Sequence, residues 1–102
     1  HTIISSSKGA VEGLTLALAA ELAPNIKVNC IAPSLTDAKM SQYLVKNENI
    51  KKAIEIMHPI PRIGNGSDFS DIGSYLLSEN NKWITGQILH IDGGRSTLRI
   101  KA

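Results

Sequence analysis

The chain has 102 residues, of which 42% are hydrophobic and 20% are charged, a composition typical of one small globular domain and not of a disordered protein. The net charge is only +2, and the lysines and arginines are scattered along the chain, so we expect no nucleic-acid partner. Cys30 has no second cysteine to pair with, and no apolar run reaches the ~18 residues of a membrane span. With no leader pattern and no histidine at a metal-ligand spacing, we expect a cytoplasmic protein without membrane contact and without a metal site.

The first half of the chain predicts a helix followed by a strand. Apolar residues recur at helical spacing from Ser7 to Leu22, among glycines and alanines that allow close approach of a neighbouring element. Pro24-Asn25 ends this helix, because a proline pushes the residue before it out of helical geometry. The alternation over residues 26–31 predicts a short strand, and residues 32–37 leave it as a loop.

The second half predicts helices and one more strand. Residues 41–57 form either one interrupted helix or two short ones, and the prolines and glycines of residues 59–66 predict an irregular crossing. Ser67 or Asp68 is expected to cap the next helix. A second strand is predicted over residues 87–91, and Asp92 is expected to cap the glycine turn that follows it by accepting backbone hydrogen bonds.

Two parallel strands with three or four helices make an incomplete α/β structure. A two-stranded parallel pair is marginal alone, since parallel strands usually belong to a larger sheet that helices cover on both faces. We therefore expect further strands, a partner chain or a second copy of this chain to cover the exposed faces.

Several segments, in this order and at these separations, resemble the C-terminal portion of short-chain dehydrogenases/reductases. The segments are Ser7-Lys8-Gly9-Ala10-Val11-Glu12-Gly13-Leu14-Thr15, Ala20-Glu21-Leu22-Ala23, Val28-Asn29-Cys30-Ile31-Ala32-Pro33, Pro61-Arg62-Ile63-Gly64, Leu76-Leu77-Ser78, Ile84-Thr85-Gly86-Gln87-Ile88 and Asp92-Gly93-Gly94. The resemblance implies that residues 1–102 are one partial domain, the C-terminal part of a Rossmann-type, doubly wound parallel sheet. The two strands are then the last two of seven.

The resemblance also implies roles for individual residues. In the family, a lysine at the position of Lys8 holds the nicotinamide ribose and lowers the pKa of a tyrosine four residues before it, which then serves as general acid or base. Ile4 stands at that tyrosine's position, so this chain resembles a divergent branch without the tyrosine. His1 lies two helical turns from Lys8 and is a candidate replacement proton donor. The alternative is a terminal histidine with no role.

The loop after the first strand corresponds to the family loop near the nicotinamide carboxamide. That loop usually reads Pro-Gly followed by a threonine, whereas this chain has Pro33-Ser34 and places Ala38 where the threonine commonly falls. Thr36 is a candidate for the amide contact, or a plain turn residue. Cofactor-binding candidates are thus Lys8, Pro33, Ser34 and Thr36.

These residues imply a function for the complete protein and three alternatives for the chain. The family is NAD- or NADP-dependent, transfers hydride to or from a carbonyl or alcohol substrate, and forms dimers or tetramers. This chain has no glycine-rich turn after a strand, and the family places that turn and a catalytic serine upstream, so the chain alone is expected to be inactive and to bind no dinucleotide. It is part of an oxidoreductase, a non-catalytic scaffold of the same fold, or a small α/β interaction module completed by its own copies.

Overall fold

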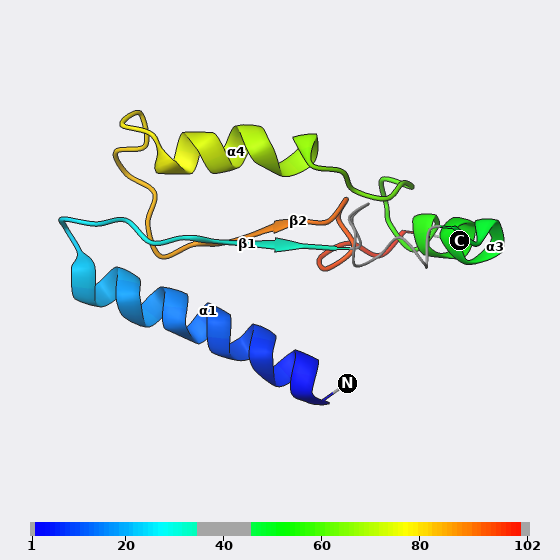
Figure 1. The fold of residues 1–102 in the computed structure, drawn as a ribbon, viewed down its shortest axis with the longest axis horizontal. Coiled ribbons are helices and arrows are strands. Elements are labelled where there is room, and N and C mark those ends of the chain that lie inside the picture. Colours follow the sequence, from blue (N-terminus) through cyan, green and yellow to red (C-terminus); the bar gives the residue numbers. More distant parts are fainter. Residues whose placement is uncertain (1, 35–45, 101–102) are drawn as a thin grey trace. The chain divides into compact units, whose positions relative to one another are not determined.

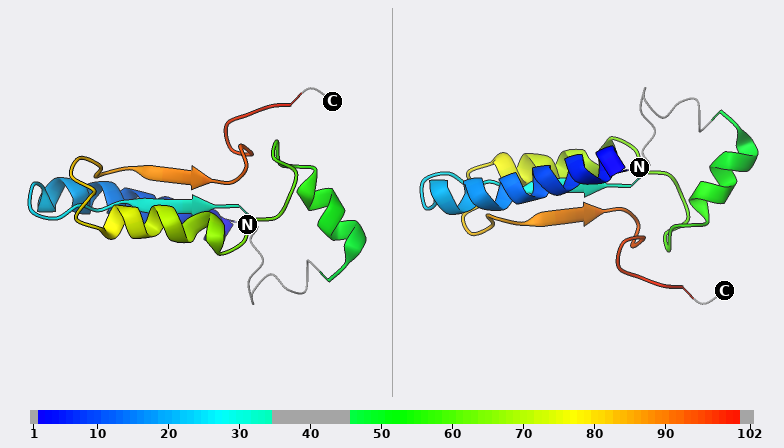
Figure 2. Two further views of the ribbon diagram at one scale, coloured as in Figure 1. Left: turned by 90° about the horizontal axis from the view of Figure 1, so that it is seen from above. Right: turned by 90° about the horizontal axis from the view of Figure 1, so that it is seen from below.

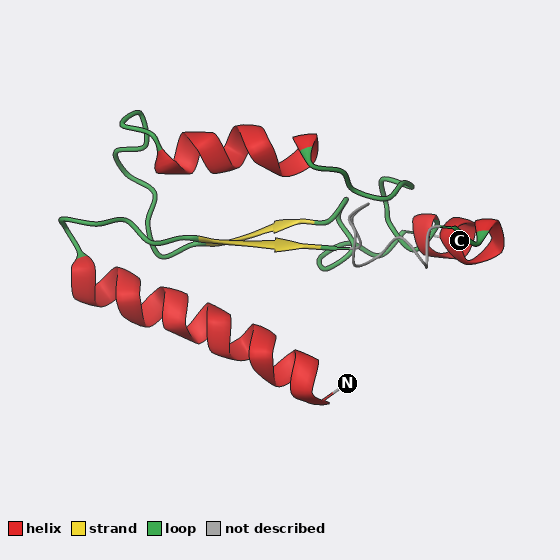
Figure 3. Ribbon diagram, viewed as in Figure 1, coloured by secondary structure: helices red, strands yellow, loops and turns green. Residues whose placement is uncertain are grey.

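The computed structural model describes residues 2–34 and 46–100, which contain three helices and two strands (Figures 1 and 3). In chain order they are α1 (Thr2–Leu22), β1 (Cys30–Pro33), α3 (Glu48–Glu55), α4 (Ser67–Leu77) and β2 (Ile88–Ile91). The two strands form one sheet and run in the same direction, side by side in both views of Figure 2. This arrangement confirms the predicted α/β fold class with a parallel strand pair.

The described residues divide into two compact units. One comprises His1–Ile31 with Ser74–Leu89, and the other comprises Ala32–Gly73 with His90–Ala102. The first unit contains α1, and the second contains α3 and the carboxyl ends of both strands. No described helix is both long enough and apolar enough to cross a bilayer.

Helix α1 begins five residues earlier than the sequence predicted, at Thr2 instead of Ser7. The serines before Lys8 are compatible with the helix, because a serine hydroxyl can donate to a backbone carbonyl of the preceding turn. Ser7 Oγ does so, donating to Ile3 O at 2.9 Å. The helix ends at Leu22, as Pro24 predicted, and the Asn25 and Ile26 amides close its last turn on the Leu22 carbonyl.

Strand β1 starts later than the predicted strand over residues 26–31. Within the strand, Cys30 N–H donates to Gln87 O at 2.9 Å. Before that point the pairing mixes backbone and side chains: Gly86 N–H donates to Val28 O at 2.8 Å, whereas Val28 N–H donates to Thr85 Oγ1 and Asn29 Nδ2 donates to Ile84 O, both at 3.0 Å. Sequence alternation marked the extended segment correctly but gave no sign of where backbone pairing begins.

The later elements lie where helices and a strand were predicted. Helix α3 falls within the predicted helical stretch over residues 41–57, of which residues 41–45 lie outside the described residues, and Asn47 Oδ1 caps it by accepting from the Asn49 and Ile50 amides. Helix α4 begins at Ser67, so the predicted cap at Ser67 or Asp68 was wrong, because both residues lie in the first turn and Asn65 Oδ1 accepts from the Ser67 amide at 3.1 Å. Strand β2 begins one residue after its predicted start.

Little apolar surface is buried within the described residues. Ala19 of α1 is their one buried apolar side chain, and it lies 3.6 Å from where a Cβ on Gly86 would stand. This contact confirms that the small-residue helix permits close approach. Other apolar side chains of α1 stay open, with Val11 54% and Leu14 57% exposed, as expected for a structure that needs further covering.

Candidate functional site

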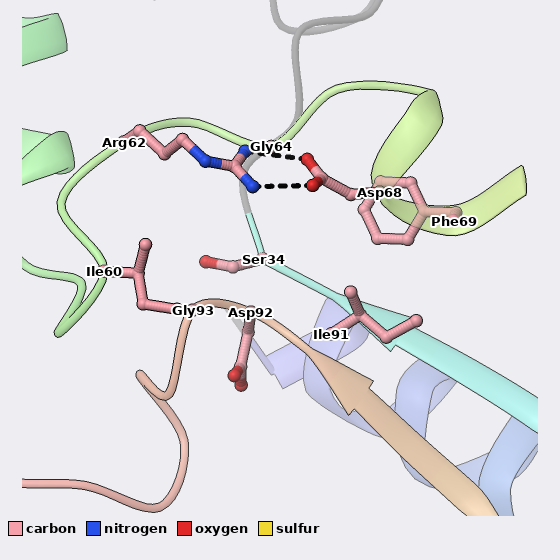
Figure 4. Close-up of a pocket in the computed structure, with 9 residues that line it drawn as sticks. All are labelled: Ser34, Ile60, Arg62, Gly64, Asp68, Phe69, Ile91, Asp92 and Gly93. Atoms are coloured by element: carbon pink, nitrogen blue, oxygen red, sulfur yellow. Dashed lines mark hydrogen bonds and ion pairs between the residues drawn. The ribbon is translucent and has the colours of Figure 1, made fainter. Parts of the chain in front are cut away.

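A pocket of about 160 Å³ lies at the carboxyl ends of the two strands, entirely within the second unit (Figure 4). Its lining residues come from three places, namely the residues that end β1 and β2, the irregular crossing after α3, and the first turn of α4. They are Ser34, Ile60, Arg62, Gly64, Asp68, Phe69, Ile91, Asp92 and Gly93. Ligands of open α/β sheets bind outside the carboxyl ends of the strands, so this pocket has the expected location for a functional site.

A serine and a histidine form a hydrogen-bonded pair beside this pocket. Ser34 Oγ lies 2.8 Å from His58 Nε2, and His58 Nδ1 lies 2.8 Å from the carbonyl oxygen of Ile54. The His58 side chain is buried, with 3% of its surface exposed. Both ring nitrogens therefore have partners, which holds the ring in one orientation against the end of β1.

Arg62 and Asp68, which both line the pocket, form a bidentate ion pair. Arg62 Nη1 and Nη2 donate to the two carboxylate oxygens of Asp68 at 2.8 and 2.6 Å, and the Asn65 amide donates to the same carboxylate at 2.8 Å. The Arg62 hydrogen bond and the Asn65 amide lower the pKa of Asp68 to about 2. This ion pair connects the irregular crossing after α3 to the first turn of α4. Each of the two charged groups has the other as its partner.

Asp92 is occupied in a similar way. Its Oδ1 accepts from the Gly94 amide at 3.0 Å, and its Oδ2 accepts from the Ser96 amide at 3.1 Å. Hydrogen bonding from the Ser96 side chain is the largest cause that lowers the pKa of Asp92, and these backbone amides add to it. The carboxylate caps the turn after β2, which confirms its predicted structural role.

The turn after β2 requires glycine at position 93. Gly93 has φ +64°, and a Cβ there would lie 3.1 Å from the Ile60 carbonyl oxygen. We expect Gly93→Ala to destabilise the protein by about 1–3 kcal/mol, because a left-handed conformation and a backbone contact both oppose the methyl group. The melting temperature of the full-length variant measures this. Gly66→Ala is the matched control, since a Cβ there meets no atom within 4 Å; equal melting temperatures for the two variants would contradict the expectation.

The structure describes three of the predicted site residues, Lys8, Pro33 and Ser34. Pro33 is exposed at the end of β1 and Ser34 follows it in the pocket, whereas Lys8 is exposed on α1 in the other unit. His1 and Thr36 lie outside the described residues. In the part of the chain that is described, no group of three or more histidine, cysteine or acidic side chains could hold a metal ion.

Sequence reasoning missed two pairs in this site. The sequence predicts no role for His58, which has no metal-ligand spacing, and its 24-residue separation from Ser34 follows no pattern of a regular element. The unusual serine after Pro33 was the available hint, because it introduces a hydroxyl where the family usually has none. Arg62 and Asp68 flank a glycine-rich turn, which is a weak signal that the two ends of the turn meet.

Comparisons with known proteins place this geometry in a family. A family profile described as enoyl-(acyl carrier protein) reductase matches residues 1–96. Dehydrogenase/reductase SDR family member 4 of Sus scrofa is 42% identical over 92 residues, which are 89% of this chain and 33% of the relative. Tropinone reductase-like 3 of Erythroxylum coca is 36% identical, over 86% of this chain and 34% of the relative.

Solved structures agree with the sequence comparisons. The structure of ElxO with NADP bound has a TM-score of 0.82 and 34% identity, and the match covers 91% of this chain and 38% of that one. A 4-hydroxyisoleucine dehydrogenase mutant complexed with NADH and succinate has a TM-score of 0.86 and 29% identity, over 93% of this chain and 40% of that one. The chain thus spans between a third and two fifths of the length of these relatives. It belongs to the short-chain dehydrogenase/reductase family and corresponds to the C-terminal portion of that fold.

Proposed function

We propose that this chain forms the nicotinamide-side half of an NAD(P)-dependent oxidoreductase that acts on a carbonyl or alcohol substrate. The observation that carries the proposal is the pocket at the carboxyl ends of two parallel strands, in a chain whose family match extends over residues 1–96. The relatives include one structure with NADP and one with NADH. The bound dinucleotide would supply the hydride.

The residues present fit one end of such a cofactor. Ser34 offers a hydroxyl at the wall of the pocket, and Lys8 is exposed on α1, so its ammonium group is accessible to ribose hydroxyls. We assign Lys8 to the nicotinamide ribose, and Pro33, Ser34 and Thr36 to the loop that faces the carboxamide. The phosphates would have to be held by a glycine-rich turn elsewhere in the complete protein, since this chain has none after a strand.

The proton donor is where this chain departs most from the family pattern. Ile4, at the position of the family's tyrosine, has no proton to give. We propose that the chain comes from a divergent branch without that tyrosine and that His1, whose imidazole titrates in the useful pH range, is the candidate donor. The chain alone is then inactive, because it lacks the dinucleotide phosphate site, and the complete protein carries the activity.

Titration of the full-length protein with NADH and NADPH tests the proposal. We expect a saturable fluorescence change with at least one of them and none with residues 1–102 alone. If the full-length protein gave no saturable signal, the oxidoreductase function would be rejected and the non-catalytic scaffold would be the better explanation. The preference between the two dinucleotides comes from the same titration.

The alternative function is a non-catalytic scaffold that uses the same fold for assembly. Ile4 favours it, and so do the open apolar side chains of α1, which include Leu16 at 52% exposure. Under either function we propose a cytoplasmic homo-oligomer, a dimer or tetramer, because a second copy would cover such a face. Light scattering of the full-length protein tests the assembly, and a monomer at micromolar concentration would contradict it.

A further inference from the structure

The turn before α4 contains the one Asn-Gly step of the sequence, Asn65-Gly66, and both residues are exposed. An asparagine is chemically least stable before a glycine, because the backbone nitrogen of the next residue attacks its side-chain amide, and glycine has no Cβ to hinder that attack. Asn25 and Asn49 are exposed as well, but each precedes an isoleucine, whose branched Cβ is in the way. Asn65 is therefore the asparagine of this chain with the least hindered neighbour.

The Gly66 amide is open to act as the attacking group. Among residues 2–34 and 46–100, the Gly66 N–H donates no hydrogen bond, whereas the Gly66 carbonyl accepts from the Phe69 and Ser70 amides as α4 begins. A Cβ on Gly66 would meet no atom within 4 Å, so the space around this residue is open. The nitrogen reacts only after it loses its proton, and solvent reaches this N–H without first breaking a hydrogen bond.

The Asn65 amide is held with its oxygen facing two donors. Asn65 Oδ1 accepts from the Ser67 backbone N–H at 3.1 Å and from Ser67 Oγ at 2.5 Å. A backbone N–H can only donate, so the atom it faces is the amide oxygen and not Nδ2. When a nucleophile attacks Cγ, negative charge develops on this oxygen, and donors already aimed at it stabilise that charge. The turn thus combines an unhindered nucleophile with a polarised amide.

We infer that Asn65 is a modification site, where the folded chain deamidates without an enzyme, and that Ser67 promotes the reaction through its hydrogen bonds to Oδ1. Hydroxide or water takes the proton of the Gly66 N–H, and the bond between that nitrogen and Asn65 Cγ forms as the bond from Cγ to Nδ2 breaks. Ammonia leaves, with a proton supplied by water. A second water then opens the cyclic imide at either of its carbonyl carbons, which gives aspartate or isoaspartate at position 65.

Either product changes the charge beside the pocket. A new carboxylate would stand three residues before Asp68, which lines the pocket and is paired with Arg62. Isoaspartate also lengthens the backbone by one carbon, between the two ends of the bonds that join Asn65 to Asp68: the Asn65 N–H donates to Asp68 Oδ2 at 2.8 Å, and the Asp68 N–H donates to the Asn65 carbonyl at 3.0 Å. The modification therefore acts on the turn that carries this wall of the pocket.

Peptide mapping of the aged full-length protein tests the inference. The folded protein is incubated at mildly alkaline pH, and mass spectrometry follows each asparagine over time. We expect Asn65 to convert to a mixture of aspartate and isoaspartate while Asn25 and Asn49, the internal controls, stay intact. Ion exchange gives an independent readout, because each conversion adds a negative charge to the protein.

Variants of the turn separate the two parts of the inference. Gly66→Ala is expected to lower the rate at Asn65 to the level of Asn25 and Asn49, because the added Cβ hinders the attack. Ser67→Ala is expected to slow the conversion about fivefold, the factor that corresponds to one hydrogen bond, and Ser67→Thr, which keeps the hydroxyl, is expected to restore it. Melting temperatures equal to that of the parent verify that the rates are compared on folded protein.

Two results would overturn the inference. If Asn65 in the parent protein stays intact for as long as Asn25 and Asn49, the turn protects its amide and the modification site is rejected. If Ser67→Ala converts at the rate of the parent, the hydrogen bonds to Oδ1 do not promote the reaction and the role of Ser67 is rejected. Neither result depends on whether the protein binds a dinucleotide.

Discussion

Lys8→Ala in the full-length protein is expected to lower kcat/KM for the dinucleotide on the order of 100-fold, the loss typical of removing one well-placed electrostatic group. The physical reason is that the ammonium group offers a positive charge and three donors to the ribose hydroxyls, whereas alanine offers neither. Alanine is also the best helix former, and Lys8 is exposed on α1, so the fold should be retained. Steady-state kinetics at varied dinucleotide concentration provide the measurement.

Two further variants sharpen this experiment. Lys27→Ala removes another exposed lysine, from the segment after α1, and should leave kcat/KM unchanged. A similar loss in both lysine variants would indicate general electrostatic attraction instead of a site role for Lys8. His1→Ala in the same assay tests the proposed proton donor, since a rate equal to that of the parent would reject that role.

The largest expected effect on stability is at Asn81, whose side chain is fully buried. Its Nδ2 donates to the carbonyl oxygens of Leu76 and Ile84 at 3.0 and 3.1 Å, and its Oδ1 accepts from Ile84 N–H at 2.9 Å. Asn81→Ala leaves three backbone groups without these bonds and opens a cavity, so we expect a loss of about 3 kcal/mol in the free energy of unfolding. Thermal melting of the full-length protein measures the loss.

Asn80→Ala is the matched control for this prediction. Asn80 is the exposed neighbour of Asn81 in sequence, and the Tyr75 hydroxyl donates to its backbone carbonyl, which alanine keeps. Hydrogen exchange at the Ile84 amide adds a local readout, because that proton loses its acceptor only in Asn81→Ala. Unchanged exchange and melting in Asn81→Ala would show that the buried amide is not needed.

Element order and type followed from local patterns, and so did the family. The apolar spacing of α1 and the proline after it are properties of neighbours in sequence, and the structure confirms both. The start of β1 was wrong, because the bonds of Val28 and Asn29 come from Ile84 and Thr85, more than 50 residues away. No local pattern reports such a partner.

The candidate site divides in the same way. Motif order alone singled out Lys8 and the loop at Pro33 and Ser34, because a family carries its chemistry at fixed positions along the chain. The partner of Ser34, by contrast, depends on where the crossing after α3 passes the end of β1, and only the folded chain decides that His58 arrives there.

By itself, then, the sequence determined the α/β class and the family, since these depend on residue identity and spacing. The tertiary structure decided which polar groups meet: Arg62 pairs with Asp68, Asp92 caps the turn after β2, and the Ser34 hydroxyl lies 2.8 Å from His58 Nε2. The physical reason is that a hydrogen bond is a property of two groups and their distance. Ser34 and His58 are 24 positions apart in the sequence, so their side chains come within hydrogen-bond distance only when the segment between them has folded.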